Sequence, residues 1–116
     1  MKPGQKHDRL EWLVDEIVPF LLTSDSGSAK GPYRFGEAYS EYAGRTTSRT
    51  EATKIVREQL MKLGKRCEGV TGQPIDFCSL ARIHAGGQDE WREIMTVPYW
   101  HKVHNMMLDA DFKRQL

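Results

Sequence analysis

The chain has 116 residues, 17 of them Lys or Arg and 16 Asp or Glu, and 39% of the residues are hydrophobic. Such values are typical of one soluble globular domain and exclude a disordered chain. No apolar run approaches the roughly 18 residues that a membrane-spanning helix needs. The first residues lack the apolar stretch of a signal peptide, and two cysteines fit a reducing compartment, so we expect a cytoplasmic protein without a membrane partner.

The first predicted helix begins at Asp8, which forms a capping box with Glu11. Pro19 lacks a backbone donor, so we expect this helix to bend or end near Val18. A Gly/Ser-rich loop follows over residues 23–32. The apolar residues of the helix recur at helical spacing and predict one buried face: Leu10, Leu13, Val14, Ile17, Val18 and Leu21.

A short second helix is predicted over residues 33–44. Phe35, Ala38, Tyr39 and Tyr42 recur at helical spacing on one face, and Gly44 follows as a C-cap. These aromatic side chains are expected to brace the helix that follows.

The third predicted helix runs from about Arg49 to Leu63. Ser48 and Glu51 form a capping box before it, and Gly64 is interpreted as the residue that stops it. Residues 45–66 hold seven Lys and Arg residues against two Glu residues, so the positive charge of the chain is concentrated here. The apolar residues share one face of this helix, and most basic residues lie opposite. The apolar face consists of Ala52, Ile55, Val56, Leu60 and Leu63.

A two-stranded hairpin is predicted after Gly64, with strands in KRCEGV and PIDFCSLARI. HAGGQ is interpreted as a turn, and DEWREIM as a short helix. Pro98 suits the first turn of a last helix. That helix carries apolar residues on two sides, because Leu108 and Phe112 lie away from the stripe that begins at Tyr99. A helix of this kind is either sandwiched in the core or shared with another chain, which makes a homodimer one expectation.

The order helix, short helix, loop, basic helix and hairpin is that of a winged helix-turn-helix. Residues 33–82 resemble the winged-helix segments of phage and plasmid replication proteins and of prophage regulators. The match is carried by an aromatic second helix, a Ser/Thr loop and a third helix with a Leu-x-x-Gly-like end: Tyr39, Tyr42, Ser48, Leu60, Leu63 and Gly64. The chain has no room for a primase or helicase domain, so the resemblance implies a binding role alone.

We therefore expect a mainly α-helical single domain, residues 1–116, with one short β-hairpin and extra C-terminal helices. It divides into an N-terminal helix and loop (1–32), a helix-turn-helix with hairpin (33–83) and C-terminal helices (87–116). The predicted function is that of a DNA-binding accessory or regulatory protein of a phage or mobile element, with double-stranded DNA as its partner.

The predicted DNA contacts lie on the third helix and beside it, where Lys and Arg would meet the duplex backbone. Thr50, Thr53, Lys54 and Arg57 are the candidates for base edges. Contacts to phosphate, which position the protein without specifying a sequence, are expected from the remaining basic residues: Arg45, Arg49, Lys62, Lys65 and Arg66.

The alternative function is a small phage-encoded interaction module, or an inhibitor of a host defence protein. Its partner-binding candidates are Trp12, Trp100, Leu108 and Phe112. Trp12 falls opposite the apolar face of the first helix. Its ring is interpreted as packed on a neighbouring loop, with a partner contact as the alternative.

We predict no catalytic residues and no cofactor. The sequence has no Gly-rich phosphate loop, nucleophile elbow or His-Glu-x-x-His motif, so an enzyme is not expected. Cys67, Cys78, His101 and His104 make a tetrahedral zinc set in principle. Their spacing matches no known zinc motif, and two buried thiols with two surface histidines are the preferred interpretation.

Overall fold

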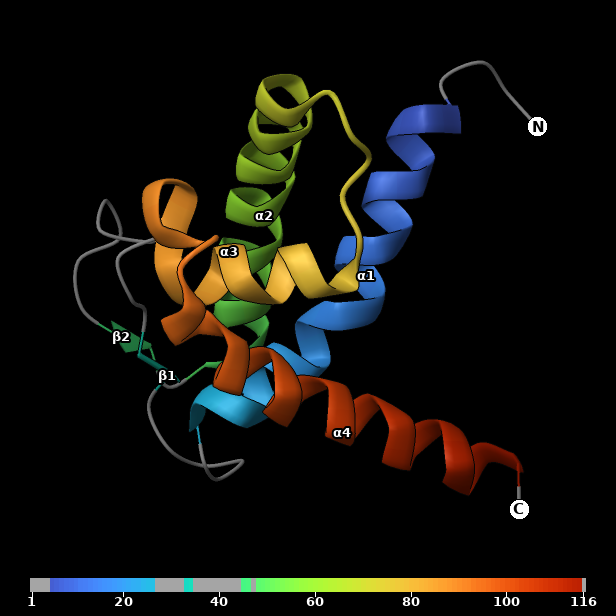
Figure 1. Ribbon diagram of the computed structural model, residues 1–116. Coiled ribbons are helices and arrows are strands. Elements are labelled where there is room, and N and C mark those ends of the chain that lie inside the picture. Colours follow the sequence, from blue (N-terminus) through green and yellow to red (C-terminus); the bar gives the residue numbers. More distant parts are fainter. Residues whose placement is uncertain (1–4, 27–32, 35–44, 47, 116) are drawn as a thin grey trace.

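The computed structural model describes residues 5–26, 33–34, 45–46 and 48–115, which form a helical domain with one small two-stranded ladder. Figure 1 shows α1 and α2 side by side, with α3 crossing them and α4 running below and out past the rest of the domain. None of the helices in these ranges has the length and apolar character needed to cross a membrane. In chain order the elements are α1 (Gln5–Ser26), β1 (Tyr33–Arg34), β2 (Arg45–Thr46), α2 (Arg49–Thr71), α3 (Phe77–Glu90), the 3-10 helix η2 (Ile94–Thr96) and α4 (Val97–Gln115).

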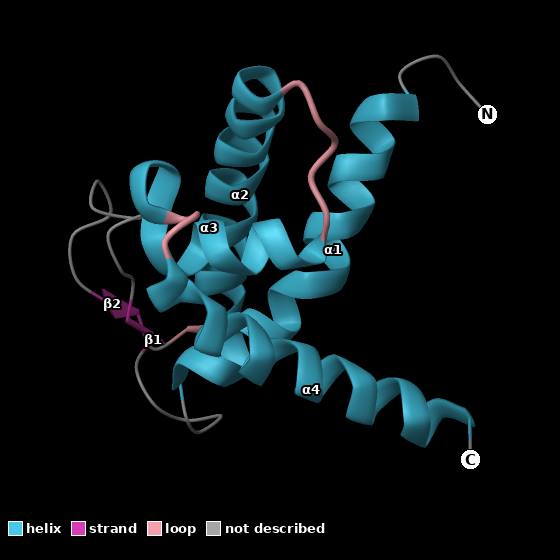
Figure 2. Ribbon diagram, in the orientation of Figure 1, coloured by secondary structure: helices cyan, strands magenta, loops and turns pink. Residues whose placement is uncertain are grey.

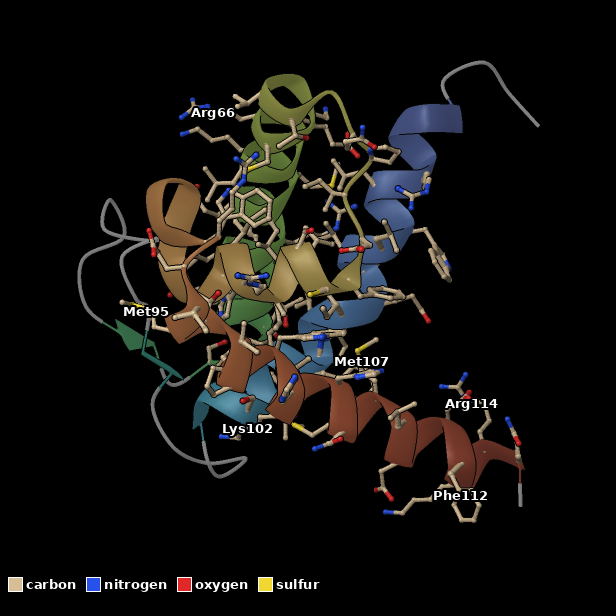
Figure 3. All side chains as sticks on the ribbon, in the orientation of Figure 1. Arg66, Met95, Lys102, Met107, Phe112 and Arg114 are labelled. Carbon is tan, nitrogen blue, oxygen red and sulfur yellow. The ribbon has the colours of Figure 1, made fainter. Side chains whose placement is uncertain are left out.

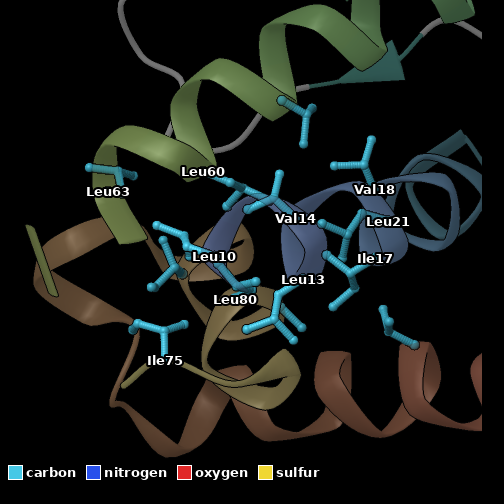
Figure 4. Packing of buried hydrophobic residues seen from close by; sticks show 14 of the residues in the cluster. Leu10, Leu13, Val14, Ile17, Val18, Leu21, Leu60, Leu63, Ile75 and Leu80 are labelled. Carbon is cyan, nitrogen blue, oxygen red and sulfur yellow. The ribbon is translucent and has the colours of Figure 1, made fainter. Parts of the chain in front are cut away.

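Helix α1 contributes more buried apolar side chains to the core than any other element (Figure 4). The predicted face is confirmed, but the predicted start at Asp8 and end near Val18 are wrong, since α1 begins at Gln5 and contains Pro19. A proline inside a helix costs about 3 kcal/mol. Burial of two further leucines offsets that cost, at about 1.5–3 kcal/mol for each. The buried apolar residues of α1 are Leu10, Leu13, Val14, Ile17, Val18, Leu21 and Leu22.

Helix α2 starts as predicted and ends later. The Ser48 side chain accepts a hydrogen bond from the Glu51 amide at 3.1 Å, which satisfies one free donor of the first turn. The helix then continues through Gly64 to Thr71 and ends at Gly72 in the left-handed conformation, with φ 69°. The predicted apolar face is buried except for Ile55, which is half-buried.

Gly64 is the point where three helices meet. A Cβ atom built on Gly64 would lie 3.1 Å from Leu10 Cδ1 of α1 and 3.6 Å from Leu80 Cδ2 of α3. The missing side chain therefore lets α1 and α3 approach the backbone of α2. Gly64 therefore allows close packing at a position inside α2, and the interpretation of Gly64 as a helix stop is wrong.

The predicted hairpin is also wrong, because α2 and α3 occupy its residues. The Asp76 carboxylate caps α3 by accepting from the Ser79 amide at 2.8 Å. The loop between the helices is held against its neighbours by Ile75. Its carbonyl accepts from Arg9 of α1 at 2.8 Å, and its amide donates to Glu68 of α2 at 2.9 Å. A helix N-cap thus stands within the predicted second strand of the hairpin.

A winged helix-turn-helix is therefore not formed by the described residues. The one ladder precedes α2 and pairs Tyr33 with Thr46 and Arg34 with Arg45 in antiparallel register. Figure 2 shows these two short strands at the edge of the helical body. Of the predicted second helix, only Tyr33 and Arg34 are described, and they form β1. Residues 35–44 lie outside the described part of the chain.

The C-terminal third also differs from expectation in its details. HAGGQ lies within α3, where Gly87 (φ 79°, ψ −177°) interrupts the helical backbone. The predicted helix over DEWREIM is replaced by a turn and η2, and Ile94 and Met95 are exposed. The last helix is confirmed, with Pro98 in its first turn.

Two glycines of α2 give a matched test of this packing. A Cβ at Gly69 meets nothing within 4 Å, in contrast to the contacts at Gly64. We expect Gly64→Val to lower the free energy of unfolding by about 2 kcal/mol, because the added atoms overpack the crossing. Gly69→Val should change it by less than about 0.5 kcal/mol. Urea denaturation measures both, and equal effects would contradict the assigned role of Gly64.

Candidate protein-interaction site

Two of the predicted DNA-contacting arginines are directed at α1. Arg57 pairs with Asp15 at 2.7 Å and with Glu11 at 3.0 Å. Arg49 donates to the carbonyl of Pro19 at 3.1 Å and to the Thr23 hydroxyl at 3.3 Å. Helix α1 therefore lies along the flank of α2 from which both arginines project.

The Arg57 ion pairs are partly exposed and contribute modestly to stability. Hydrogen bonding to Asp15 is the main cause that raises the pKa of Arg57 above its ordinary value. A raised pKa on a basic group adds stability that is lost only as pH rises through that pKa. The ion pairs therefore add no pH dependence near neutrality, and their effect is to fix the Arg57 side chain on α1.

Of the seven remaining predicted DNA contacts, six lie on α2 and Arg45 lies in β2. The Thr53 hydroxyl donates to the Arg49 carbonyl at 2.7 Å within its own helix. The backbone of Arg45 lies in β2, and its side chain is outside the described part of the structure. The exposed residues of the predicted set are Arg49, Thr50, Lys54, Lys62, Lys65 and Arg66.

A groove of about 450 Å³ lies between α1, the start of α3 and α4, and we call it the aromatic groove. Its walls hold three of the four residues predicted as partner contacts: Trp12, Trp100 and Leu108. Sequence reasoning missed the other lining residues. The lining residues on α1 could have been found in the sequence, because Glu16 and Phe20 follow Trp12 at four-residue spacing and so share its face of the helix. The additional lining residues are Glu16, Phe20, Asp76, Phe77, Cys78, His104, Met107, Asp111 and Arg114.

Two pairs of rings shape the aromatic groove. The Trp12 ring lies 5.7 Å from that of Phe77, so it packs on the first turn of α3 and not on a loop as interpreted from the sequence. Trp12 nevertheless remains 56% exposed. On the opposite wall Trp100 and His104 are stacked, with ring centroids 4.7 Å apart and planes 9° apart. Both walls thus present flat, partly exposed aromatic surface.

The charges along the aromatic groove are mainly acidic. Glu16, Asp76 and Asp111 contribute carboxylates, and Arg114 contributes the one guanidinium among the lining residues. A surface that combines aromatic walls with carboxylates at its edges complements an apolar segment flanked by basic side chains.

Helix α4 is attached to the domain mainly through its first half. Val103 is fully buried, the rings of Tyr99 and His84 lie 5.8 Å apart, and Lys102 donates to the Ser24 carbonyl at 3.3 Å. From residue 104 on, every described side chain is exposed or half-buried. The second half of α4 therefore projects from the body, as Figure 1 shows.

The projecting half carries two large apolar side chains that are largely exposed, Leu108 at 54% and Phe112 at 63%. Together with Trp100 and His104 they follow one another at four-residue spacing, and we call this line the α4 ridge. In Figure 3 Met107 and Arg114 lie on the side of α4 toward α1 and α3, whereas Phe112 points away from them. The α4 ridge thus begins in the aromatic groove and winds to the outer side of the helix.

The cysteines and histidines of the zinc alternative are not gathered. Cys67 lies on α2 and Cys78 on α3, both as free thiols, because the hairpin that would have paired them is absent. His101 and His104 are exposed on α4. Among the described residues, no group of three or more His, Cys, Asp or Glu side chains is arranged to hold a metal ion.

The sequence and fold match no family model, no curated protein and no solved structure.

The two thiols should differ in reactivity. Burial is the main cause that raises the pKa of both, but Cys67 is buried among core residues whereas Cys78 lines the aromatic groove. A raised pKa lowers the thiolate fraction at neutral pH, so both should react more slowly than a free thiol with Ellman's reagent. We expect Cys78 to react first and the Cys78→Ser variant to lose the faster phase. A faster phase that survives in that variant would contradict this placement.

Proposed function

We propose that this protein is a protein-interaction module and that its working surface is the aromatic groove together with the α4 ridge. The observation that carries the proposal is the exposure of Trp12 and Leu108, which both line one groove, together with that of Phe112, one turn farther along α4. Large apolar side chains scattered singly over a surface need no explanation, but a connected set beside a groove is typical of a binding site.

The chemistry of the groove selects a class of partner. Tryptophan rings are the side chains that most often dominate binding energy at protein interfaces, and both walls hold one. A helical segment with two apolar residues four positions apart can lay them against these walls. Glu16 and Asp111 then favour Lys or Arg next to the apolar pair.

DNA binding through α2 stays a prediction from the sequence, and the geometry gives it less support. Arg49 and Arg57, two of its expected contacts, hold α1 instead. The predicted hairpin, which would have followed the basic helix as the wing of a winged helix-turn-helix, is not formed.

An mRNA-displayed library of helical peptides, selected against the immobilised protein, tests the proposal. Selected peptides should carry paired apolar residues with flanking Lys or Arg, and they should slow the reaction of Cys78 with Ellman's reagent. Trp12→Ala should weaken their binding at least about 30-fold, as expected for an interface hot spot. The control Ile94→Ala removes a side chain that is 82% exposed and does not line the groove, so binding should be unchanged.

Peptides that bind equally well to the Trp12→Ala and Ile94→Ala variants would overturn the proposed site. The competing prediction is tested in parallel by fluorescence anisotropy on mixed DNA duplexes over a salt series. Steeply salt-dependent binding that is lost in a Lys54→Ala/Lys65→Ala double variant, without peptide binding, would establish DNA as the partner instead.

A further inference from the structure

We infer that the segment bound at this surface is the end of α4 from a second copy of this chain. This inference rests on the proposed function and names its partner. The end of α4 has the features that the aromatic groove selects: Leu108 and Phe112 stand four residues apart, and Lys113 and Arg114 follow directly. Both apolar side chains are more than half exposed in the isolated chain.

The projecting half of α4 has little apolar burial of its own. Twelve residues, 104–115, extend past the last buried side chain of α4, Val103, and isolated helices shorter than about 12–15 residues are marginal in water. The ion pair between Lys113 and Asp109, at 3.0 Å, is solvent-exposed and contributes little. A second chain that packs on the α4 ridge buries the exposed apolar side chains of this half of the helix.

A two-fold axis near Leu108 makes the α4 ridge self-complementary. In an isologous contact each surface patch meets its own copy. Two α4 helices that cross in antiparallel sense at Leu108 bring Phe112 of each chain toward the stacked rings of Trp100 and His104 in the other. Ridges at four-residue spacing interdigitate in the commonest class of helix packing.

Charge complementarity favours the same arrangement. The antiparallel crossing carries Lys113 of one chain toward the aromatic groove of the other, where Glu16 and Asp76 contribute carboxylates. The Lys113 side chain is 71% exposed in its ion pair with Asp109. Because an exposed ion pair contributes little free energy, Lys113 can exchange Asp109 for a carboxylate of the second copy at little cost. Each contact is made twice, because the two-fold axis repeats it.

Sedimentation equilibrium of the full chain, from about 1 µM to about 200 µM, measures the self-association. We expect the wild type to reach twice the monomer mass of 13.3 kDa. Leu108→Asp and Phe112→Asp should each raise the dimer dissociation constant at least about 30-fold. Both positions are exposed, so these variants should fold, which circular dichroism checks. The control Ile94→Asp introduces the same charge at an exposed apolar position outside the groove and should leave the dimer intact.

Crosslinking tests the geometry itself. In a Cys78→Ser background, Leu108→Cys should form an intermolecular disulfide on mild air oxidation, because the two-fold axis places these positions face to face. Ile94→Cys should not. A dimer that neither Leu108→Asp nor Phe112→Asp weakens would overturn the inference, since the contact would lie elsewhere.

A wild type that stays monomeric over the whole concentration range would also overturn the inference. The proposed function would survive that result if library peptides still bind in a manner that depends on Trp12. If the chain is monomeric and no peptide binding depends on Trp12, both fail. Sedimentation equilibrium therefore tests the inference, and peptide binding tests the proposed function independently of it.

Discussion

The contact between Leu10 and Gly64 fixes the distance between α1 and α2, and the rest of the domain is arranged around that crossing. A Cβ on Gly64 would stand 3.1 Å from Leu10 Cδ1, so the helices pack more closely here than two ordinary side chains allow. Leu80 of α3 reaches the same point, and Arg49 and Arg57 tie α1 to α2 farther along. Three helices are thereby held as one unit, and the outer side of α1 is left open to form a wall of the aromatic groove.

The position of α4 follows from that unit. Val103 enters the core beside α1, and the connection before α4 is held by Arg82 of α3, which donates to the Thr96 hydroxyl at 2.8 Å and the Glu93 carbonyl at 3.2 Å. These contacts end within the first two turns of a helix of 19 residues. Farther along α4, Met107 still packs against the core, whereas Leu108 and Phe112 are exposed and belong to the surface that we propose for another chain.

The sequence predicts the buried face of a helix from an apolar stripe, and it predicts some helix starts from a cap or a proline. The stripe of α1, the Ser48 cap of α2 and the start of α4 at Pro98 are of this kind. The prediction from the sequence fails at Gly64, because a glycine that ends a helix and one that admits a neighbouring helix have the same local pattern. That error led to the hairpin, although Asp76, followed by apolar residues at helical spacing from Phe77 to His84, already carried the signal of a capped helix.

In the candidate site too, the local sequence reveals some residues and only the tertiary fold reveals the others. Trp12, Trp100 and Leu108 could be nominated from the sequence because they fall outside the apolar stripes, whereas Phe77 and Met107 join them only through the tertiary fold. The charge pattern of α2 does not reveal which basic side chains turn toward a neighbouring helix, as Arg49 and Arg57 do.

The central claim is that the projecting half of α4 is covered in the working protein. Hydrogen–deuterium exchange of the backbone amides of residues 105–115 tests it most directly, measured at about 1 µM and about 200 µM on the same timescale. We expect slow exchange at the high concentration, and faster exchange at the low concentration and in the Leu108→Asp variant. Equally fast exchange at both concentrations would contradict it.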